Sequence, residues 1–488
     1  MLGETLVLLG LLILVFLYFT RRRQKKEPPL DKGFVPWLGH ALAFRKDAAK
    51  FLSQMKETHG DIFTVCVAGQ YVTLLLDPNS FDAVLTDTDN FTHNKRQLLQ
   101  RIFSLQLPNI KPSAERKWME QHFQGLSLSK LCSSTNRHIE DILINCRDSS
   151  PSEWRRDGLF SLCYSFLFRA GYLTLFERRD NTSLVYEEFR KFDSLLTKLA
   201  RCSLKKAERQ TAKLTREQLW ELLSPKLTSR GSESGSWQLS YHRFLQDEGV
   251  DAEMQKRALL FQLWTTQCNA GPAAFWLLGF LLTHPEAMEA LKSEISGLSH
   301  WDASLEQPLI NSLEASCTPV FDSILSETLR LTAAVMISRE VRQDKVLIMA
   351  SGQEYHLRQG DKVCLFPYLS PQMDPVIHQE PQVFKYDRFL NDDMTVKDRF
   401  YKNGQRLKHY NMPWGAGSNV CTGKAFAVRA IKQFVLLFLT HFDLELCDPE
   451  AKLPPFNPNR YGFGILHPDG DLLVRSRAKD NAPSSVIL

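Results

Sequence analysis

The sequence predicts a mainly α-helical protein with small β-sheets, an α+β fold, held to a membrane by one helix at its N-terminus. Apolar residues recur at helical spacing in several long segments, of which residues 424–440 are the clearest. Residues 61–76 instead look like a β-hairpin, in which Phe63, Val65 and Val67 alternate, Gly69 makes the turn and residues 71–76 return. Residues 6–19 form an apolar run, and this run predicts the membrane helix.

The N-terminal run predicts a single-pass anchor over residues 1–20. Glu4 is the only charged side chain before residue 20, and a basic cluster follows at residues 21–26. A cleaved signal peptide is the alternative, but such peptides carry their basic residues before the apolar run and a small-residue cleavage site after it. The positive-inside rule places everything after the cluster in the cytosol. We therefore expect an endoplasmic reticulum protein whose partner is the lipid bilayer.

The remainder of the chain is expected to form one large domain. A length of 488 residues allows about two to four domains. However, no internal repeat appears, and the one stiff linker is the basic, proline-containing hinge at residues 21–36. Residues 37–488 are thus predicted to be a single domain. A net charge of +5 and the lack of any zinc-finger or related motif argue against a nucleic-acid binder.

The ten cysteines are scattered along the chain and include no C-x-x-C pair. This distribution is unlike a zinc site or a secreted disulfide framework. It indicates a domain that stays in a reducing compartment.

A long helix is predicted over residues 254–283, with a length of roughly 45 Å. It contains Gly271-Pro272 past its middle. Because an interior proline removes a backbone donor, the helix is expected to bend there. Two interpretations remain open: a packing kink in a core helix, or an opening beside a bound cofactor.

Another helix is expected to begin at Thr318-Pro319, where Thr suits the N-cap and Pro the first helical position. Near its end, Glu327 and Arg330 are three residues apart and share one side of the helix. Most such pairs are exposed and contribute little to stability, so this signal is weak alone.

Cys421 is the strongest candidate for chemistry. It lies in the run Trp414-Gly415-Ala416-Gly417-Ser418-Asn419-Val420-Cys421-Thr422-Gly423, directly before the helical pattern of residues 424–440. Gly417 and Gly423 are expected to supply sharp turns, and the start of the helix is expected to lower the pKa of the thiol. A thiolate there suits an axial ligand of haem iron. The alternative is a buried structural cysteine.

The whole pattern resembles the haem-thiolate loop of the cytochrome P450 superfamily. Trp414, Gly417 and Gly423 stand at the superfamily's positions relative to Cys421, and Gly415 belongs to the same run. The resemblance extends to the Glu327–Arg330 pair and to residues 384–389, which supply Arg388 as the third member of a structural triad. It implies the cytochrome P450 fold with haem b held by Cys421.

Two haem contacts depart from the superfamily pattern. Asn419 replaces a basic residue that pairs with a haem propionate. Arg339 is the expected substitute, with an exposed strand arginine as the alternative. In the Trp-x-x-x-Arg segment, His122 stands in the arginine's place after Trp118, and it is either a propionate partner or a surface histidine.

The oxygen site also departs from that of typical monooxygenases, which carry an acid and a threonine in the central helix. Here Cys268 and Asn269 occupy those positions, and neither readily gives up a proton near neutral pH. Several stretches, including residues 269–276, 410–417 and 460–464, resemble the branch of the superfamily that isomerises prostaglandin H2. That branch needs no NADPH, dioxygen or reductase. The alternatives are a sterol 12α-hydroxylase-like monooxygenase and a non-catalytic haem protein that senses or carries a lipid.

The resemblance also implies residues on the substrate side, in a protein expected to be monomeric in the membrane. Asn269 is expected above the iron, where its amide can bond the endoperoxide and take part in catalysis. The remaining substrate-binding candidates are Arg101, Leu107, Ser338, Arg339 and Lys362. For Lys362, the alternative is an ordinary strand-edge lysine.

Overall fold

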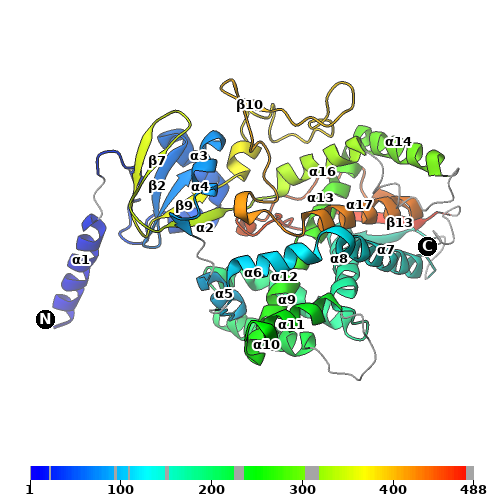
Figure 1. Cartoon of the computed structure of the whole chain (residues 1–488), viewed down its shortest axis with the longest axis horizontal. Coiled ribbons are helices and arrows are strands. Elements are labelled where there is room, and N and C mark those ends of the chain that lie inside the picture. Colours follow the sequence, from blue (N-terminus) through cyan, green and yellow to red (C-terminus); the bar gives the residue numbers. More distant parts are fainter. Residues whose placement is uncertain are drawn as a thin grey trace.

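The computed structural model describes residues 2–20, 24–92, 96–107, 110–148, 153–224, 236–302 and 318–479. A strand-rich region and a larger helical region lie side by side, and helix α1 (Leu2–Thr20) stands apart from both (Figure 1). This arrangement bears out the mainly helical class with small sheets that the sequence predicts.

The strand-rich region contains a six-stranded sheet in the order β1-β2-β3-β9-β6-β4. The strands are β1 (Leu30–Asp31), β2 (Ile62–Val67), β3 (Gln70–Leu75), β4 (Phe91–Thr92), β6 (Ile337–Val341) and β9 (Lys362–Leu365). The predicted hairpin is confirmed as the antiparallel pair β2–β3. Strands from the two ends of the sequence therefore meet in one sheet, because β3 pairs with β9 in parallel.

Three smaller sheets complete the strand content of the described residues. They are β12-β13-β5 (Phe442–Leu446, Leu473–Ala478 and Arg155–Gly158), β7-β8 (Lys345–Ile348 and Glu354–Leu357) and β10-β11 (Tyr401–Lys402 and Gln405–Arg406).

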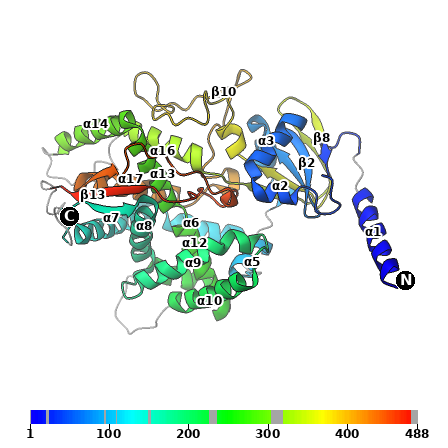
Figure 2. The same ribbon diagram turned by 180° about the vertical axis from the view of Figure 1, so that it is seen from behind.

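Helices α2 (Ala41–Lys46), α3 (Ala48–His59) and α4 (Asp82–Leu85) accompany the large sheet. At the bottom of the helical region in Figure 1 lies a group of five helices: α5 (Arg96–Phe103), α9 (Thr182–Ala200), α10 (Lys206–Leu223), α11 (Trp237–Asp247) and α12 (Ala252–Gln267). Figure 2 shows α5, α9, α10 and α12 from behind. The remaining helices are α6 (Pro112–His122), α7 (Gly125–Asp148), α8 (Leu159–Phe176), α13 (Ala270–Thr283), α14 (Pro285–Asp302), α16 (Pro319–Thr332) and α17 (Lys424–His441).

The main apolar core lies where α7, α8, α13 and α17 pack together. Helix α8 has the length and hydropathy of a membrane span, but it is largely buried in this core. In α1 the apolar stretch Gly3–Val15 is shorter than a typical span. The anchor therefore stays a prediction.

The segment that follows α1 is attached to the sheet. The Lys26 carbonyl accepts a hydrogen bond from His356 N at 2.8 Å, and Glu27 pairs with Arg358. Strand β1 then pairs in parallel with β2. Residues 26–31 of the predicted hinge thus belong to the folded body.

Candidate functional site

The Cys421 loop is folded by its own backbone. Cys421 N donates to the Trp414 carbonyl at 2.9 Å, which closes the loop. Gly417 has φ +60°, and a Cβ there would meet the Leu85 carbonyl oxygen at 3.1 Å. Gly415 also lies in the left-handed region, at φ +74°. The prediction for Gly423 is wrong in this respect, because its φ of −85° suits any residue.

Helix α17 begins at Lys424, so Cys421 precedes it by three residues as predicted. The sulfur is accessible, and protein surrounds it at longer range. Burial raises the pKa of the Cys421 thiol, while the Gly423 N–H and the charges of Arg116 and Lys424 act in the opposite direction. The expected lowering by the helix start is thus outweighed by desolvation. A metal cation bonded to the sulfur would reverse that balance.

Arg116, on α6, holds the loop from outside. Its Nη1 donates to the Ser418 carbonyl at 2.6 Å and to the Val420 carbonyl at 3.2 Å. Its Nε pairs with Glu120 at 2.8 Å. No sequence motif pointed to this arginine, because it meets the loop across about three hundred residues of chain.

The three charged side chains predicted to form a triad lie together. Both oxygens of Glu327 accept from Arg330 (2.7 and 2.8 Å) and from Arg388 (2.9 Å each). All three side chains are buried or nearly so. The remaining guanidinium N–H groups donate to backbone carbonyls, with Arg330 bonding Gln372 and Pro381. The triad therefore fixes the segment that leads toward Cys421.

That segment connects to the loop through His378. Its Nε2 donates to the Tyr410 carbonyl at 3.0 Å, four residues before Trp414. Burial, with the charge of Arg330 behind it, lowers the pKa of His378 to about 3, so the ring is neutral. Contacts among Phe389, Phe400 and Tyr410 surround it.

The basic residues before the loop also have partners. Lys402 pairs with Asp374 at 3.0 Å, Arg406 with Asp398 at 3.3 Å, and Lys408 and His409 with Asp82 at 2.9 and 2.8 Å.

The predicted helix over residues 254–283 is in fact two helices. Helix α12 ends at Gln267, and α13 begins at Ala270. The prediction of a bend at Gly271-Pro272 placed it slightly too late, for a clear reason. Pro272 has no N–H to donate to the Cys268 carbonyl one turn earlier, so the helix opens at Cys268 and Asn269.

Buried polar side chains surround the Cys268 carbonyl, which lacks its helical hydrogen bond. The Tyr164 hydroxyl lies 3.5 Å from it and 3.4 Å from Asp193 Oδ2, so its single proton can be donated to either acceptor. His467 interacts with the Cys268 backbone as well. Asp193 lies behind them and forms a buried ion pair with Arg460. Burial and the charge of Arg460 hold the pKa of His467 well below its usual value, so it bonds as a neutral ring.

The helix break lies near Cys421. The charge of Cys421 is among the groups that raise the pKa of the Cys268 thiol, although burial is the main cause. Asn269 is half-buried at the same break, and its Oδ1 accepts from Ile465 N at 2.9 Å. Asn269 and Cys268 thus lie together at the break, and Cys268 is within electrostatic range of Cys421.

Arg339 and Ser338 point to opposite faces of the sheet. Arg339 pairs with Val363, whose side chain packs in the cluster that includes Met412 and Ala416 from the Cys421 loop. Since side chains alternate along a strand, Arg339 lies on this loop-facing side. It is buried, and burial lowers its pKa to about 10.

Ser338 and Lys362 lie on the other face, opposite Cys364 and Glu340 respectively. Lys362 Nζ donates to Gln70 Oε1 at 2.8 Å on a neighbouring strand. The structure therefore does not group Ser338 and Lys362 with Arg339.

Of the other candidates, His122 and Arg101 are on helices α6 and α5, and Leu107 is in the segment that follows α5. His122 stacks on Trp118 with ring centroids 3.8 Å apart, and its Nδ1 bonds the Trp118 carbonyl at 2.8 Å. Only its Nε2 is left for another partner. Arg101 is exposed on α5, and Leu107 packs half-buried against the main core.

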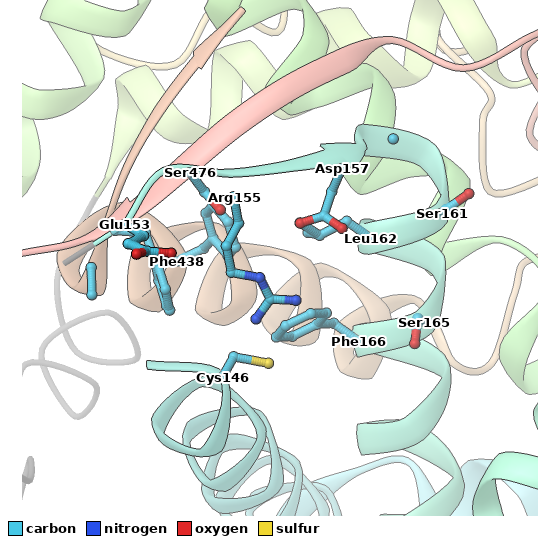
Figure 3. Close-up of a pocket in the computed structure, with 13 residues that line it drawn as sticks. Cys146, Glu153, Arg155, Asp157, Ser161, Leu162, Ser165, Phe166, Phe438 and Ser476 are labelled. Carbon is cyan, nitrogen blue, oxygen red and sulfur yellow. The ribbon is translucent and has the colours of Figure 1, made fainter. Parts of the chain in front are cut away.

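A separate pocket of about 230 Å³ lies between α8, α17 and the β5–β13 strands. Figure 3 shows Arg155 and Cys146 among its lining residues. None of the predicted haem or substrate residues lines it, so it is distinct from the candidate site.

Comparison with known proteins identifies the family. The cytochrome P450 family model matches residues 269–474. The chain is 47% identical to prostacyclin synthase of Rattus norvegicus over 481 residues, covering 94% of this chain and 95% of the relative. The chain belongs to the cytochrome P450 family. Prostacyclin synthase of Homo sapiens is also 47% identical, with the same coverage. The 7-alpha-hydroxycholest-4-en-3-one 12-alpha-hydroxylase of Oryctolagus cuniculus is 40% identical over 97% of this chain and 98% of that enzyme.

Family membership implies a haem with a cysteine thiolate ligand, and the residues fit this group. Cys421 presents an accessible sulfur at the start of α17, between glycines. Arg339 supplies a buried positive charge on the face of the sheet that packs against the Cys421 loop, suitable for a propionate.

Proposed function

We propose that this protein isomerises prostaglandin H2 to prostacyclin, with haem b bound through Cys421. The relatives with the higher identity, 47%, are prostacyclin synthases. The proposal places the enzyme in the endoplasmic reticulum membrane, anchored by α1 with its catalytic domain in the cytosol, and acting as a monomer.

One observation carries the proposal. At the break between α12 and α13, a typical monooxygenase of this family carries an acid and a hydroxyl that help deliver protons to bound oxygen, although sterol hydroxylases tolerate Asn in place of the hydroxyl residue. Here Cys268 is buried with a raised pKa, and Asn269 has its carbonyl oxygen bonded to a backbone N–H. Neither side chain can deliver protons near neutral pH. Chemistry in which the substrate supplies its own oxygen–oxygen bond needs no such delivery.

The overall reaction balances without an external reductant. The O–O bond breaks, the oxygen on carbon 9 joins carbon 6, and one hydrogen leaves carbon 6 while the oxygen on carbon 11 gains one. Substrate and product are isomers. Haem supplies the one-electron chemistry that cleaves the peroxide when it is bound, and the thiolate favours that cleavage.

In this proposal, residues of the chain bind and orient the substrate and the haem. Asn269 donates a hydrogen bond to an endoperoxide oxygen, and Arg339 pairs with a haem propionate. Arg101 and Leu107 border the substrate. Ser338 and Lys362 are also substrate candidates, but they lie on the sheet face opposite Arg339.

The deciding experiment supplies the purified, haem-loaded protein with prostaglandin H2 and no NADPH or reductase. We expect 6-keto product from hydrolysis of prostacyclin, and no product from Cys421→Ala. The reduced carbon monoxide complex of the wild type should show the red-shifted Soret band of thiolate ligation. A protein that shows this band yet leaves the endoperoxide unchanged would overturn the proposal.

A sterol 12α-hydroxylase-like monooxygenase is the second candidate, favoured by the 40% identity to such enzymes. It predicts hydroxylation of a 7α-hydroxylated sterol that depends strictly on NADPH, dioxygen and a reductase. A third outcome, a ligand-induced spectral change without turnover, would point to a lipid-sensing haem protein.

A further inference from the structure

The carboxamide of Asn269 lies directly against the backbone of the C-terminal loop, residues 460–467. Ile465 N donates to Asn269 Oδ1 at 2.9 Å. A Cβ built on Gly464 would lie 2.3 Å from Asn269 Oδ1, 3.1 Å from its Cγ and 3.2 Å from its Nδ2. The whole amide group therefore rests in the space that the missing side chain of Gly464 leaves.

The loop is rigidly held on its other sides. Ala334 N donates to the Gly464 carbonyl at 2.9 Å, and Leu466 N donates to the Thr332 carbonyl at 2.8 Å. The Trp276 indole N–H, from α13, donates to the Leu466 carbonyl at 2.7 Å. These bonds fix the direction of the Ile465 N–H, so the loop acts as a template for Asn269.

The template determines which end of the amide is free. A backbone N–H can only donate, so it must face the amide's oxygen and not its nitrogen. The oxygen is thereby occupied, and no bond within the described residues uses Asn269 Nδ2. An amide locked in this way presents a donor to a ligand and does not present an acceptor.

We propose that Gly464 and the Ile465 N–H are positioning groups that make Asn269 a dedicated hydrogen-bond donor to an oxygen atom of the substrate. The assignment rests on the proposed function for the identity of the substrate, an endoperoxide. The structural part of the proposal does not depend on that identity: the loop leaves the NH2 group of Asn269 free to donate a hydrogen bond to any ligand oxygen bound above Cys421.

The chain offers a matched pair of variants to test this. Gly464 and Gly462 both have positive φ, +94° and +89°, so alanine strains the backbone similarly at either position. At Gly462, however, the new Cβ would meet only the flexible side chain of Met336, at 3.5 Å. Gly464→Ala displaces the amide of Asn269, whereas Gly462→Ala leaves it in place.

The first measurement is the Soret shift on titrating haem-loaded variants with a stable endoperoxide analogue that keeps the ring oxygen. We expect Gly464→Ala to weaken binding about tenfold, the size of one net hydrogen bond. Asn269→Ala should do the same, and Gly462→Ala should bind as wild type. Imidazole, which coordinates iron through nitrogen and needs no donor from residue 269, should bind all four proteins alike.

The double variant Gly464→Ala/Asn269→Ala provides a second test. Because both changes remove one interaction, the double variant should bind no more weakly than Asn269→Ala alone. Asn269→Asp keeps an acceptor for Ile465 N–H but loses the donor, so it should also weaken the analogue.

Three results would overturn the inference: additive losses in the double variant, an equal loss in Gly462→Ala, or wild-type binding by Asn269→Asp. These readouts need no turnover. If the wild type binds the analogue with the predicted variant pattern but fails to isomerise prostaglandin H2, the proposed function fails and the positioning role stands.

Discussion

Replacing Glu327 by Gln tests how much the buried triad contributes to stability. The substitution keeps the shape of the side chain but removes its charge and turns one acceptor into a donor. Glu327 and Arg330 are fully buried, and Arg388 is nearly so. Two guanidinium groups then face an uncharged amide with no route to solvent.

The magnitude follows from this geometry. Breaking a buried ion pair by removing one partner costs about 3–5 kcal/mol, because the remaining charge stays uncompensated. Arg330 keeps its bonds to the Gln372 and Pro381 carbonyls, and Arg388 keeps its bond to Gln379, which moderates the loss. We expect a decrease of about 4 kcal/mol in the free energy of unfolding, roughly a thousandfold in the folded-to-unfolded ratio.

The assay is urea unfolding followed by tryptophan fluorescence and, in parallel, by the Soret band. Glu445→Gln is the matched control, since Glu445 pairs with Arg475 at 2.7 Å but both side chains are about half exposed. Exposed pairs contribute about 0–1 kcal/mol. If Glu327→Gln and Glu445→Gln lowered the unfolding free energy equally, the reasoning from burial would be refuted.

Three further predictions concern the neighbouring elements. The pKa of His378 is about 3 in the folded state, so between about pH 6.5 and 3 the ring binds a proton only in the unfolded chain. The free energy of unfolding should therefore fall by about 1.4 kcal/mol for each pH unit that the pH drops through that range. His378→Gln should remove this contribution from the pH dependence of the urea midpoint. Arg339→Gln should speed haem transfer to apomyoglobin about tenfold if one propionate pair is lost, while Lys362→Gln, on the opposite sheet face, should not; equal rates would exclude Arg339 as the partner. Tyr164→Phe removes one donor to the Cys268 carbonyl or to Asp193 and should cost about 1 kcal/mol of stability in urea, with no change if His467 alone satisfies that carbonyl.

The sequence was sufficient where the signal is local. The Cys421 loop, the start of α17, the β2–β3 hairpin and the Glu327–Arg330 spacing each depend on residues a few positions apart. Short-range patterns of this kind carry their own geometry, so the predicted elements follow from them. Arg388 lies 61 residues from Glu327, and its place in the triad was implied by the family resemblance.

The sequence was insufficient where distant segments meet. Pro272 predicts a bend, but the groups that stabilise the opening, Tyr164 and His467, come from far away in the chain. Ser338 and Arg339 face opposite sides because side chains alternate along any strand, but which side meets the Cys421 loop depends on strand pairing and tertiary packing. Arg116 likewise reaches the Cys421 loop only through tertiary packing.

The attachment of Lys26 to strand β8 sets the reach of the membrane tether. Lys26, whose carbonyl accepts from His356 N, is six positions after Thr20, the last residue of α1. A fully extended chain of that length spans about 20 Å. With α1 inserted in a bilayer, the edge of the β7–β8 hairpin could not rise further than this from the end of the helix. Such a short linker would hold the domain close to the membrane surface, where a poorly soluble lipid reaches the domain without crossing a long distance of water.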